Sequence, residues 1–415
     1  MKTLRNAVIA IFAGLILMIS CKKSDIALPK SEANIDSIAS KYYEGYLKMY
    51  PLEATMQGDS RYNDLLSNNI SSEFISKEIE FYTDTQKKLK SIEYDDLSDE
   101  QKTVYDVLDY TLKDKIERYA YHPELLPFSQ FEGLPLDFPL LGSAEGNQPF
   151  KTTKDYDNWL KRIDAFVIWM NTAEKNFREG MKQNVVLPKK LVVKMIPQMH
   201  SEEIITEDFD KNIFYGPIKK MPKNFSAKDK EKYKILYQEA ISSKIIPAYQ
   251  KMGDFLEKEY LPKARNTDGI NALPNGKNIY EYYAKSWTTT NKTPEEINKI
   301  GLQQVAMLRA EMEKVKTQLG FKGSLEEFLT SLKTDKKAMP YKTPEEVIAA
   351  FNGILKKIEP KLPSMFSKFP KTPFEIRRTE KFREASASAE YKQGTPDGKR
   401  PGIFYTPIPD ATKYN

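Results

Sequence analysis

Apolar residues recur at helical spacing over most of this chain from about Ile35 onward. The clearest case extends from about Asp155 to Met181 and predicts a helix with one wide apolar face. Its apolar residues are Trp159, Ile163, Phe166, Met170, Ala173 and Phe177. Such a face is typical of a core, so these aromatic residues are expected to pack inside the protein rather than to bind a cofactor. The pattern predicts a mainly α protein with a large multi-helical body.

A second helical run is predicted from about Lys228 to Tyr260, with a kink at Pro247. Its apolar positions are Tyr233, Leu236, Ile241, Ile245, Tyr249, Met252, Phe255 and Leu256. Between the two runs, the stretch from His122 to Phe150 contains several prolines among apolar residues. This density of proline predicts a long apolar loop instead of a helix. The loop either covers the core or lines a cleft.

Several helix starts are marked by capping residues. Ser98 and Gln101 have the spacing of a capping box, and the helix after them is expected to bury Val104, Leu108, Leu112 and Ile116. The acids around Ser98 lack the alternating ligands and central glycine of a calcium loop, so capping explains them better.

The sequence Thr-Pro-Glu-Glu occurs twice, beginning at Thr293 and at Thr343. Each copy places threonine at the N-cap, proline at the first helical position and glutamate at the third, which predicts a helix start. The first helix is expected to end at Gly320. Its apolar residues are Ile297, Ile300, Val305, Leu308, Met312, Val315 and Leu319.

The C-terminal segment has a different pattern, with small and polar residues alternating from Ser386 to Tyr391 and a turn signal between Gly394 and Gly398. Extended structure resumes at 403–405. We predict a β hairpin or a pair of edge strands against the helical body.

The N-terminus carries two cationic residues, Lys2 and Arg5, followed by an apolar run from Ala7 to Ile19. This run is too short to span a bilayer and is typical of a signal peptide. The single cysteine of the chain, Cys21, follows directly, as in a bacterial lipoprotein signal. We therefore expect residues 1–20 to be a signal peptide, Cys21 to be lipidated and residues 21–34 to form a tether. The protein would then be anchored in the bacterial cell envelope, on the periplasmic face or the cell surface. The alternative is an ordinary signal peptide with an incidental cysteine.

Composition narrows the function classes. Apolar residues make up 40% of the chain and charged residues 29%, as in a globular protein. The net charge of +6 is spread along the sequence, so no concentrated basic stripe points to nucleic acid. The chain has only two histidines, His122 and His200. His200 and Glu203 have helical spacing, but two ligands do not make a zinc site, so a surface or capping role is expected.

An ordered series of short signatures in the second half resembles the bacterial DUF885 family. They are Tyr260-Leu261-Pro262, Gly269-Ile270, Trp287-Thr288-Thr289, Thr293-Pro294-Glu295-Glu296, Gly320-Phe321 and Arg400-Pro401-Gly402-Ile403-Phe404-Tyr405. Weaker similarity extends back to Tyr50-Pro51 and Gly58-Asp59, so the resemblance covers nearly all of residues 35–415.

This resemblance implies a helical fold like that of gluzincin-type zinc peptidases. Complete family members carry a His-Glu-Ala-x-Pro-Gly-His-His motif after the Arg-Pro-Gly segment, followed by a glutamate-bearing helix. The present sequence contains neither that motif nor the sequence signature of another catalytic site. We therefore expect no catalytic residues and no metal or other cofactor in this chain, although zinc is expected in a complete member. The domain at 35–415 is expected to be incomplete, ending before the zinc motif.

What the resemblance does imply here is the approach to a peptide-binding cleft. Tyr391, Asp397, Arg400 and Tyr405 fall in the matching segment and are the candidate substrate-binding residues. Arg400 could pair with a substrate carboxylate or lock the turn through Asp397.

Three hypotheses about function follow. The chain is the N-terminal portion of an envelope-anchored metallopeptidase-like lipoprotein, inactive alone. Alternatively, it is a non-catalytic lipoprotein that binds peptides or proteins, or one half of an enzyme completed by a separate chain.

Overall fold

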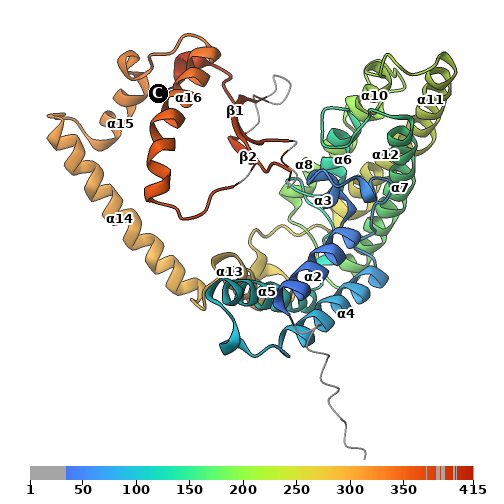
Figure 1. Cartoon of the computed structure of the whole chain (residues 1–415), viewed down its shortest axis with the longest axis horizontal. Coiled ribbons are helices and arrows are strands. Elements are labelled where there is room, and N and C mark those ends of the chain that lie inside the picture. Colours follow the sequence, from blue (N-terminus) through green and yellow to red (C-terminus); the bar gives the residue numbers. More distant parts are fainter. Residues whose placement is uncertain are drawn as a thin grey trace, which may run out of the picture. The chain divides into compact units, whose positions relative to one another are not determined.

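The computed structural model describes residues 34–370, 372–379, 384, 388–395, 398 and 400–414. The predicted signal peptide, Cys21, the tether up to residue 33 and the candidate residue Asp397 therefore lie outside the described residues. The described chain is mainly helical with a small mixed sheet near its C-terminus, which confirms the predicted fold class (Figure 1). Within the described residues, no helix is both long enough and apolar enough to cross a membrane.

Contacts between residues divide the chain into two compact units. The first comprises the chain up to Gly45 together with Lys77–Ile116. It contains parts of α2 (Ile35–Met49), α4 (Ser72–Leu89) and α5 (Asp99–Arg118). Its small core is formed by Ile35, Ile38, Tyr82, Leu89, Leu108 and Leu112.

The predicted capping box at the start of α5 is present. The Ser98 hydroxyl accepts from the Gln101 N–H at 3.3 Å, and the Gln101 side chain accepts from the Ser98 N–H at 3.2 Å. The expected buried stripe is shorter than predicted, because Val104 is 38% exposed while Leu108 and Leu112 are buried. Val104 is not among the residues of this unit's core or those packed against it.

The second unit comprises Tyr46–Ser76 and Glu117–Asn415. Its helices are α3 (Pro51–Met56), α6 (Leu134–Gly142), α7 (Thr153–Lys182), α8 (Lys189–Met199), α9 (Glu202–Ile205), α10 (Gly216–Lys219), α11 (Ala227–Ala240), α12 (Ile246–Phe255), α13 (Gly276–Thr288), α14 (Pro294–Gln318), α15 (Leu325–Thr334) and α16 (Pro344–Ile358). Its short 3₁₀ turns are at Ser60–Tyr62, Tyr119–Tyr121, Pro123–Leu125, Ile213–Tyr215, Leu261–Lys263, Ile270–Ala272, Lys336–Ala338, Glu359–Ser364 and Ala411–Lys413, whereas the turn at Tyr94–Asp96 belongs to the first unit. The predicted starts at Thr293 and Thr343 are confirmed, since each threonine caps its helix in a capping box.

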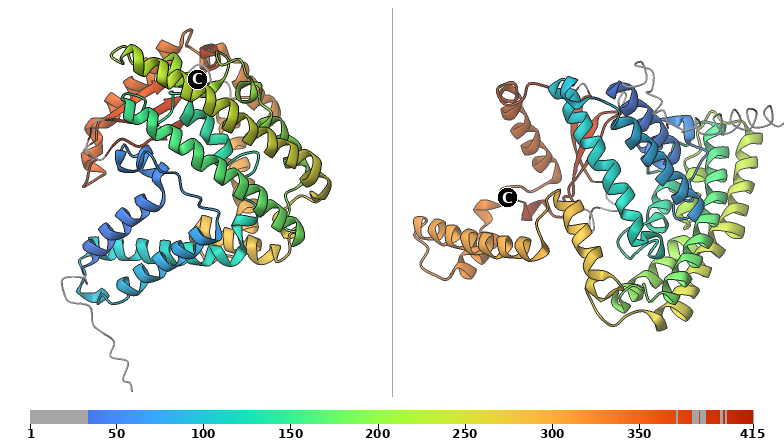
Figure 2. Two further views of the ribbon diagram at one scale, coloured as in Figure 1. Left: turned by 90° about the vertical axis from the view of Figure 1, so that its right-hand side faces the viewer. Right: turned by 90° about the horizontal axis from the view of Figure 1, so that it is seen from below.

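The core of this unit is built around α7, with α11 and α12 alongside it (Figure 2). All six residues of the apolar face predicted for α7 are buried. The ring of Phe138 stacks on Trp159 and on Phe166, with ring centroids 4.6 and 4.0 Å apart. These aromatic residues therefore fill a core, as predicted.

The helical run from about Lys228 to Tyr260 is present but contains two π-helical turns, η6 (Ile241–Ile245) and η7 (Leu256–Tyr260). Pro247 stands in the first turn of α12, directly after η6. A proline cannot donate to the preceding turn, so a wider turn at this point accommodates it. The interruption occurs where the sequence predicts a kink.

The expected loop between His122 and Phe150 contains a helix, so that prediction is wrong for α6. Pro135 lies in the first turn of α6, where its missing N–H costs nothing, and Pro139 lies inside the helix. Pro139 leaves the carbonyl of Pro135 without its helical donor. The buried hydroxyl of Tyr249 donates to that carbonyl at 2.8 Å, so the carbonyl of Pro135 still has a hydrogen-bond donor.

Three strands form the C-terminal sheet: β1 (Phe374–Arg378), β2 (Glu390–Lys392) and β3 (Gly402–Thr406). The predicted antiparallel pair exists, with Tyr391 opposite Phe404. The hairpin alternative is therefore confirmed, and β3 is the central strand rather than an edge strand because β1 also pairs with it, in parallel. Helix α16 packs on this sheet, with the Phe351 and Phe404 ring centroids 6.2 Å apart.

Candidate functional site

The register of the sheet determines which side chains share a face. Phe374 stands opposite Gly402, and Tyr391 stands opposite Phe404. Paired residues, and every second residue along a strand, point to the same side of a sheet. Phe374 and Tyr391 therefore lie on one face, with ring centroids 6.1 Å apart. Between them is Gly402, where any Cβ would collide with the Tyr391 hydroxyl.

The opposite face is charged. It carries Glu375 and Arg377 from β1, Glu390 and Lys392 from β2, and Tyr405 from β3. Lys392 lies 5.5 Å from the centre of the Tyr405 ring. A hydrogen bond from Arg377 to Glu375 at 2.7 Å raises the pKa of the guanidinium. These pairs leave this face with cations and acids in close alternation.

Arg400 connects the turn between β2 and β3 to the helical body. Its guanidinium donates to the Asn147 side chain and to the Gln393 carbonyl, each at 3.3 Å, and to the Met56 carbonyl. Its backbone N–H donates to the Thr395 hydroxyl at 3.0 Å. These described acceptors are neutral oxygen atoms, and they fix the base of the turn beside Gly58 and Asn147.

The three candidate residues that the structure describes do not converge on one point. Tyr391 is 58% exposed on one face, whereas Tyr405 belongs to the other because its partner is Glu390. Arg400 lies at the turn, and Asp397 is outside the described residues. Phe374 was not among the residues predicted from the sequence, and its ring completes the exposed aromatic pair with Tyr391. The alternation of apolar and charged residues in Phe374–Arg378 is the signal that could have revealed β1.

The outer edges of this sheet belong to β1 and β2, and no further strand pairs with them in the described part of the chain. Four of the five residues of β1 are exposed. An unpaired strand edge presents backbone N–H and C=O groups to another extended chain. The arrangement can therefore bind a peptide backbone by strand addition, with Phe374 and Tyr391 available to its side chains.

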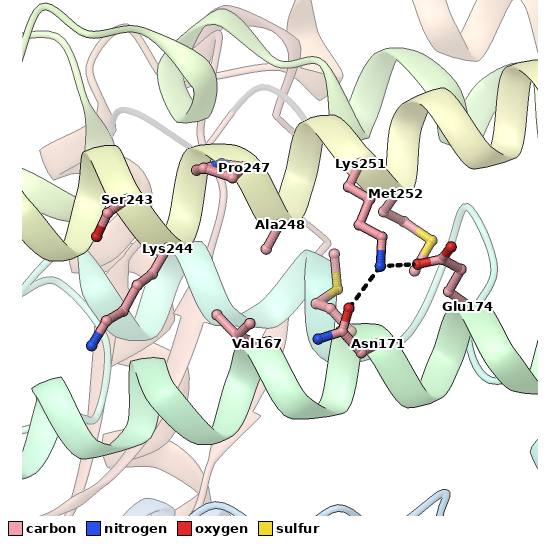
Figure 3. Close-up of a pocket in the computed structure, with 10 residues that line it drawn as sticks. Val167, Asn171, Glu174, Ser243, Lys244, Pro247, Ala248, Lys251 and Met252 are labelled. Carbon is pink, nitrogen blue, oxygen red and sulfur yellow. Dashed lines mark hydrogen bonds and ion pairs between the residues drawn. The ribbon is translucent and has the colours of Figure 1, made fainter.

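Two hollows elsewhere are less suited to a ligand. A pocket of about 170 Å³ lies between α7 and the η6–α12 segment, where Lys251 pairs with Glu174 at 2.7 Å (Figure 3). Its volume is below the roughly 300 Å³ of typical ligand pockets. A second, open hollow is lined by Lys189, Lys190, Lys194 and Arg265. Its cations are partly engaged, since Lys190 pairs with Asp268 at 3.0 Å and Arg265 donates to nearby backbone carbonyls.

The two histidines have acidic neighbours in the structure, and His200 has the capping position that was expected of it. His122 contacts Glu124 at 2.9 Å. His200 is the C-cap residue of α8, and the acids near its ring are Asp254 and Glu257 rather than Glu203.

Comparison with known proteins shows which family the chain matches. The family described as "Bacterial protein of unknown function (DUF885)" matches residues 51–415. A protein from Colwellia psychrerythraea, described as a "putative lipoprotein", has a similar solved structure with a TM-score of 0.77 and 19% identity. The match covers 92% of this chain and 68% of that one.

A second solved structure, a "putative lipoprotein of unknown function" from Shewanella oneidensis, gives a TM-score of 0.61 at 14% identity. The match covers 90% of this chain and 65% of the Shewanella oneidensis protein. At these identities the likeness establishes the fold. No curated protein matches the chain.

Proposed function

We propose that this chain, which belongs to the DUF885 family, is an envelope-anchored lipoprotein that binds extended peptides along the outer edge of β1. Lipid attachment at Cys21 is supported by the apolar run before it and by the lipoprotein descriptions of both solved relatives. The proposed role is the substrate-binding part of a metallopeptidase-like fold. Because this sequence contains no His-Glu zinc motif, the isolated 415-residue chain is expected not to hydrolyse peptides.

The observation that carries the proposal is the exposed edge of β1, whose Phe374 ring packs against Tyr391 of β2 on one face of the sheet. Backbone hydrogen bonds contribute affinity whatever the peptide sequence is, and each contributes about 1 kcal/mol net. Exposed aromatic rings above the strand favour peptides with apolar residues at alternate positions. The charged opposite face would then contact the remaining side chains of the peptide.

The test measures binding of fluorescent peptides with alternating apolar residues to the full chain in detergent, by anisotropy. We expect binding that falls at least tenfold when alternate peptide nitrogens are methylated, because methylation removes the donors and keeps the side chains. Phe374→Ala and Tyr391→Ala should each weaken binding. Phe369→Ala, which removes a 49% exposed ring outside the sheet, is the matched control. Equal binding of methylated and unmethylated peptides would exclude strand addition.

A second candidate function, non-catalytic binding of another protein, is favoured by α14. Its apolar residues Val305, Leu308, Met312, Val315 and Leu319 are spaced alternately three and four apart and are 45–67% exposed. Such a stripe is typical of a helix that packs against a partner helix or groove. A photoreactive residue at Leu308 should then crosslink to one envelope protein in cells, while the same residue at Lys314 should not. No adduct at Leu308 would remove this candidate.

A further inference from the structure

Three side chains capable of binding a metal meet where α8 and α12 pack together. They are His200 at the end of α8, Asp254 in α12 and Glu257 in the π turn η7. One ligand atom of each lies within 4.8 Å of the others. His200 Nε2 and Asp254 Oδ1 lie 4.0 Å apart.

The fold positions these groups through Gly253. The imidazole of His200 lies directly against this glycine, and a Cβ at position 253 would overlap its ring. Asp254 and Glu257 are three residues apart on one helical segment, so they project from the same side of it. The close approach of the ring to the helix therefore brings a nitrogen donor beside two carboxylates from successive turns.

Of the two carboxylates in the cluster, one has a described cationic partner. Asp254 Oδ2 pairs with Lys258 Nζ at 2.9 Å, so its Oδ1 is the oxygen that faces His200. Glu257 makes no hydrogen bond or ion pair with any residue that the structure describes. It also lies in a π turn, a distortion that occurs frequently at functional sites. One of the two carboxylates is thus paired with a lysine, and the other, Glu257, lies beside the imidazole without such a partner among the described residues.

We infer that His200, Asp254 and Glu257 bind a divalent transition-metal cation. One imidazole nitrogen and two carboxylate oxygens are a common ligand set for such ions, and water would occupy the remaining positions. Bonds of about 2.0–2.2 Å to zinc place neighbouring ligand atoms about 3–3.5 Å apart. The distances between the ligand atoms must therefore shorten by about 1 Å when the metal binds. Rotation of the exposed Asp254 and Glu257 side chains allows this. This site does not depend on peptide binding by the sheet, and it contradicts the expectation that the chain holds no metal.

The test titrates Zn²⁺ into the metal-free full chain in detergent, purified with a tag that contains no histidine. Calorimetry and elemental analysis should give one chelator-sensitive zinc per chain. His200→Ala, Asp254→Asn and Glu257→Gln should each raise the dissociation constant at least tenfold. His122→Ala and Glu203→Gln are the matched controls and should leave it unchanged, because neither residue belongs to the cluster.

Two further variants separate metal binding from a general loss of structure. Gly253→Ala keeps all three ligands and improves helix propensity, but it displaces the imidazole and should abolish binding. Lys258→Gln removes the competing cation and should tighten binding severalfold. Circular dichroism checks that each variant remains helical. The inference fails if the wild-type chain binds no stoichiometric zinc, if His122→Ala is as harmful as His200→Ala, or if Lys258→Gln weakens binding.

Discussion

At the scale of single residues, Arg162 shows where sequence patterns stop being informative. It stands among the correctly predicted core residues of α7 and is completely buried. Its guanidinium donates to the carbonyls of Pro51, Tyr62 and Leu65, at 3.3, 3.2 and 2.9 Å, and to the side chains of Thr55 and Gln148. The apolar periodicity alone would place a lone arginine in solvent, because four of its five acceptors lie 97–111 residues away in the chain.

Arg162 is therefore expected to be a major determinant of stability in the second unit. Arg162→Met should destabilise the fold by about 3 kcal/mol, because it leaves several buried oxygens without donors. Arg162→Lys should recover part of this loss, since lysine offers fewer donors in a different geometry. Urea denaturation followed by circular dichroism measures both. Arg309→Met, at an exposed position of α14, is the control and should change stability by less than about 0.5 kcal/mol.

The same limit applies to the candidate sites. The sequence identified His200 as a possible metal ligand, but it did not identify the acids beside it. The candidate partner Glu203 is close to His200 in sequence, whereas Asp254 and Glu257 are close to it in space. Likewise, Tyr391 was identified from the family resemblance, and its partner Phe374 depends on a parallel strand pairing. Residue types can be read from a sequence. The packing of the His200 ring against Gly253, which leaves no room for a Cβ at that position, cannot.

At the scale of elements, the features that depend on local chemistry were predictable. The capping boxes at Ser98, Thr293 and Thr343 involve residues three positions apart, and all three are present. Elements that depend on distant partners were not. Helix α6 tolerates Pro139 because Tyr249 donates to the orphaned carbonyl, and β1 exists because β3 pairs with it.

Buried tyrosines in α7, α11, α12 and the π turn η7 should make the protein sensitive to alkaline pH. Burial raises the pKa of Tyr156, Tyr237, Tyr249 and Tyr260 above the usual value, whereas these phenols ionise near pH 10 in the unfolded chain. The folded state then binds more protons above about pH 10, so stability is full below that pH and falls as pH rises. Burial also lowers the pKa of Arg162 to about 10, which acts in the opposite direction, but one guanidinium is outweighed by four phenols.

Urea denaturation between neutral pH and about pH 12 should show this fall, with tyrosinate absorbance appearing as the chain unfolds. Tyr237→Phe removes one buried phenol and should reduce the slope above about pH 10, although it also loses the hydrogen bond to the Tyr156 carbonyl. Tyr391→Phe, at an exposed ring, should leave the slope unchanged. An equal slope in all three proteins would mean that the buried tyrosines do not govern alkaline unfolding.

At the scale of the whole molecule, the ordered signatures between Tyr260 and Tyr405 identified the family, because their order and spacing are far more specific than any one of them. The match to residues 51–415 and the fold of two solved relatives agree with that identification. The mainly α class followed from apolar periodicity alone. The zinc-peptidase relationship stays a proposal, since it depends on a motif that this sequence does not contain.

The exposed stripe of α14 has a consequence for the isolated protein. None of its apolar side chains is buried in the described structure, although the capped, amphipathic helix has the pattern of a packed one. A contiguous apolar surface of this kind binds hydrophobic dyes and promotes association. We expect the purified chain to bind such a dye and to self-associate as its concentration rises.

Replacing Leu308 and Met312 together by glutamate should reduce both effects, because the charges disrupt the stripe while glutamate remains a good helix former. The matched control replaces Gln303 and Ala310 by glutamate, which adds the same negative charge to exposed positions on the opposite side of α14. Dye fluorescence and sedimentation velocity measure the two effects, and circular dichroism verifies the helix. If both double variants behave alike, net charge rather than the stripe controls association; if neither changes dye binding, the dye reports another surface.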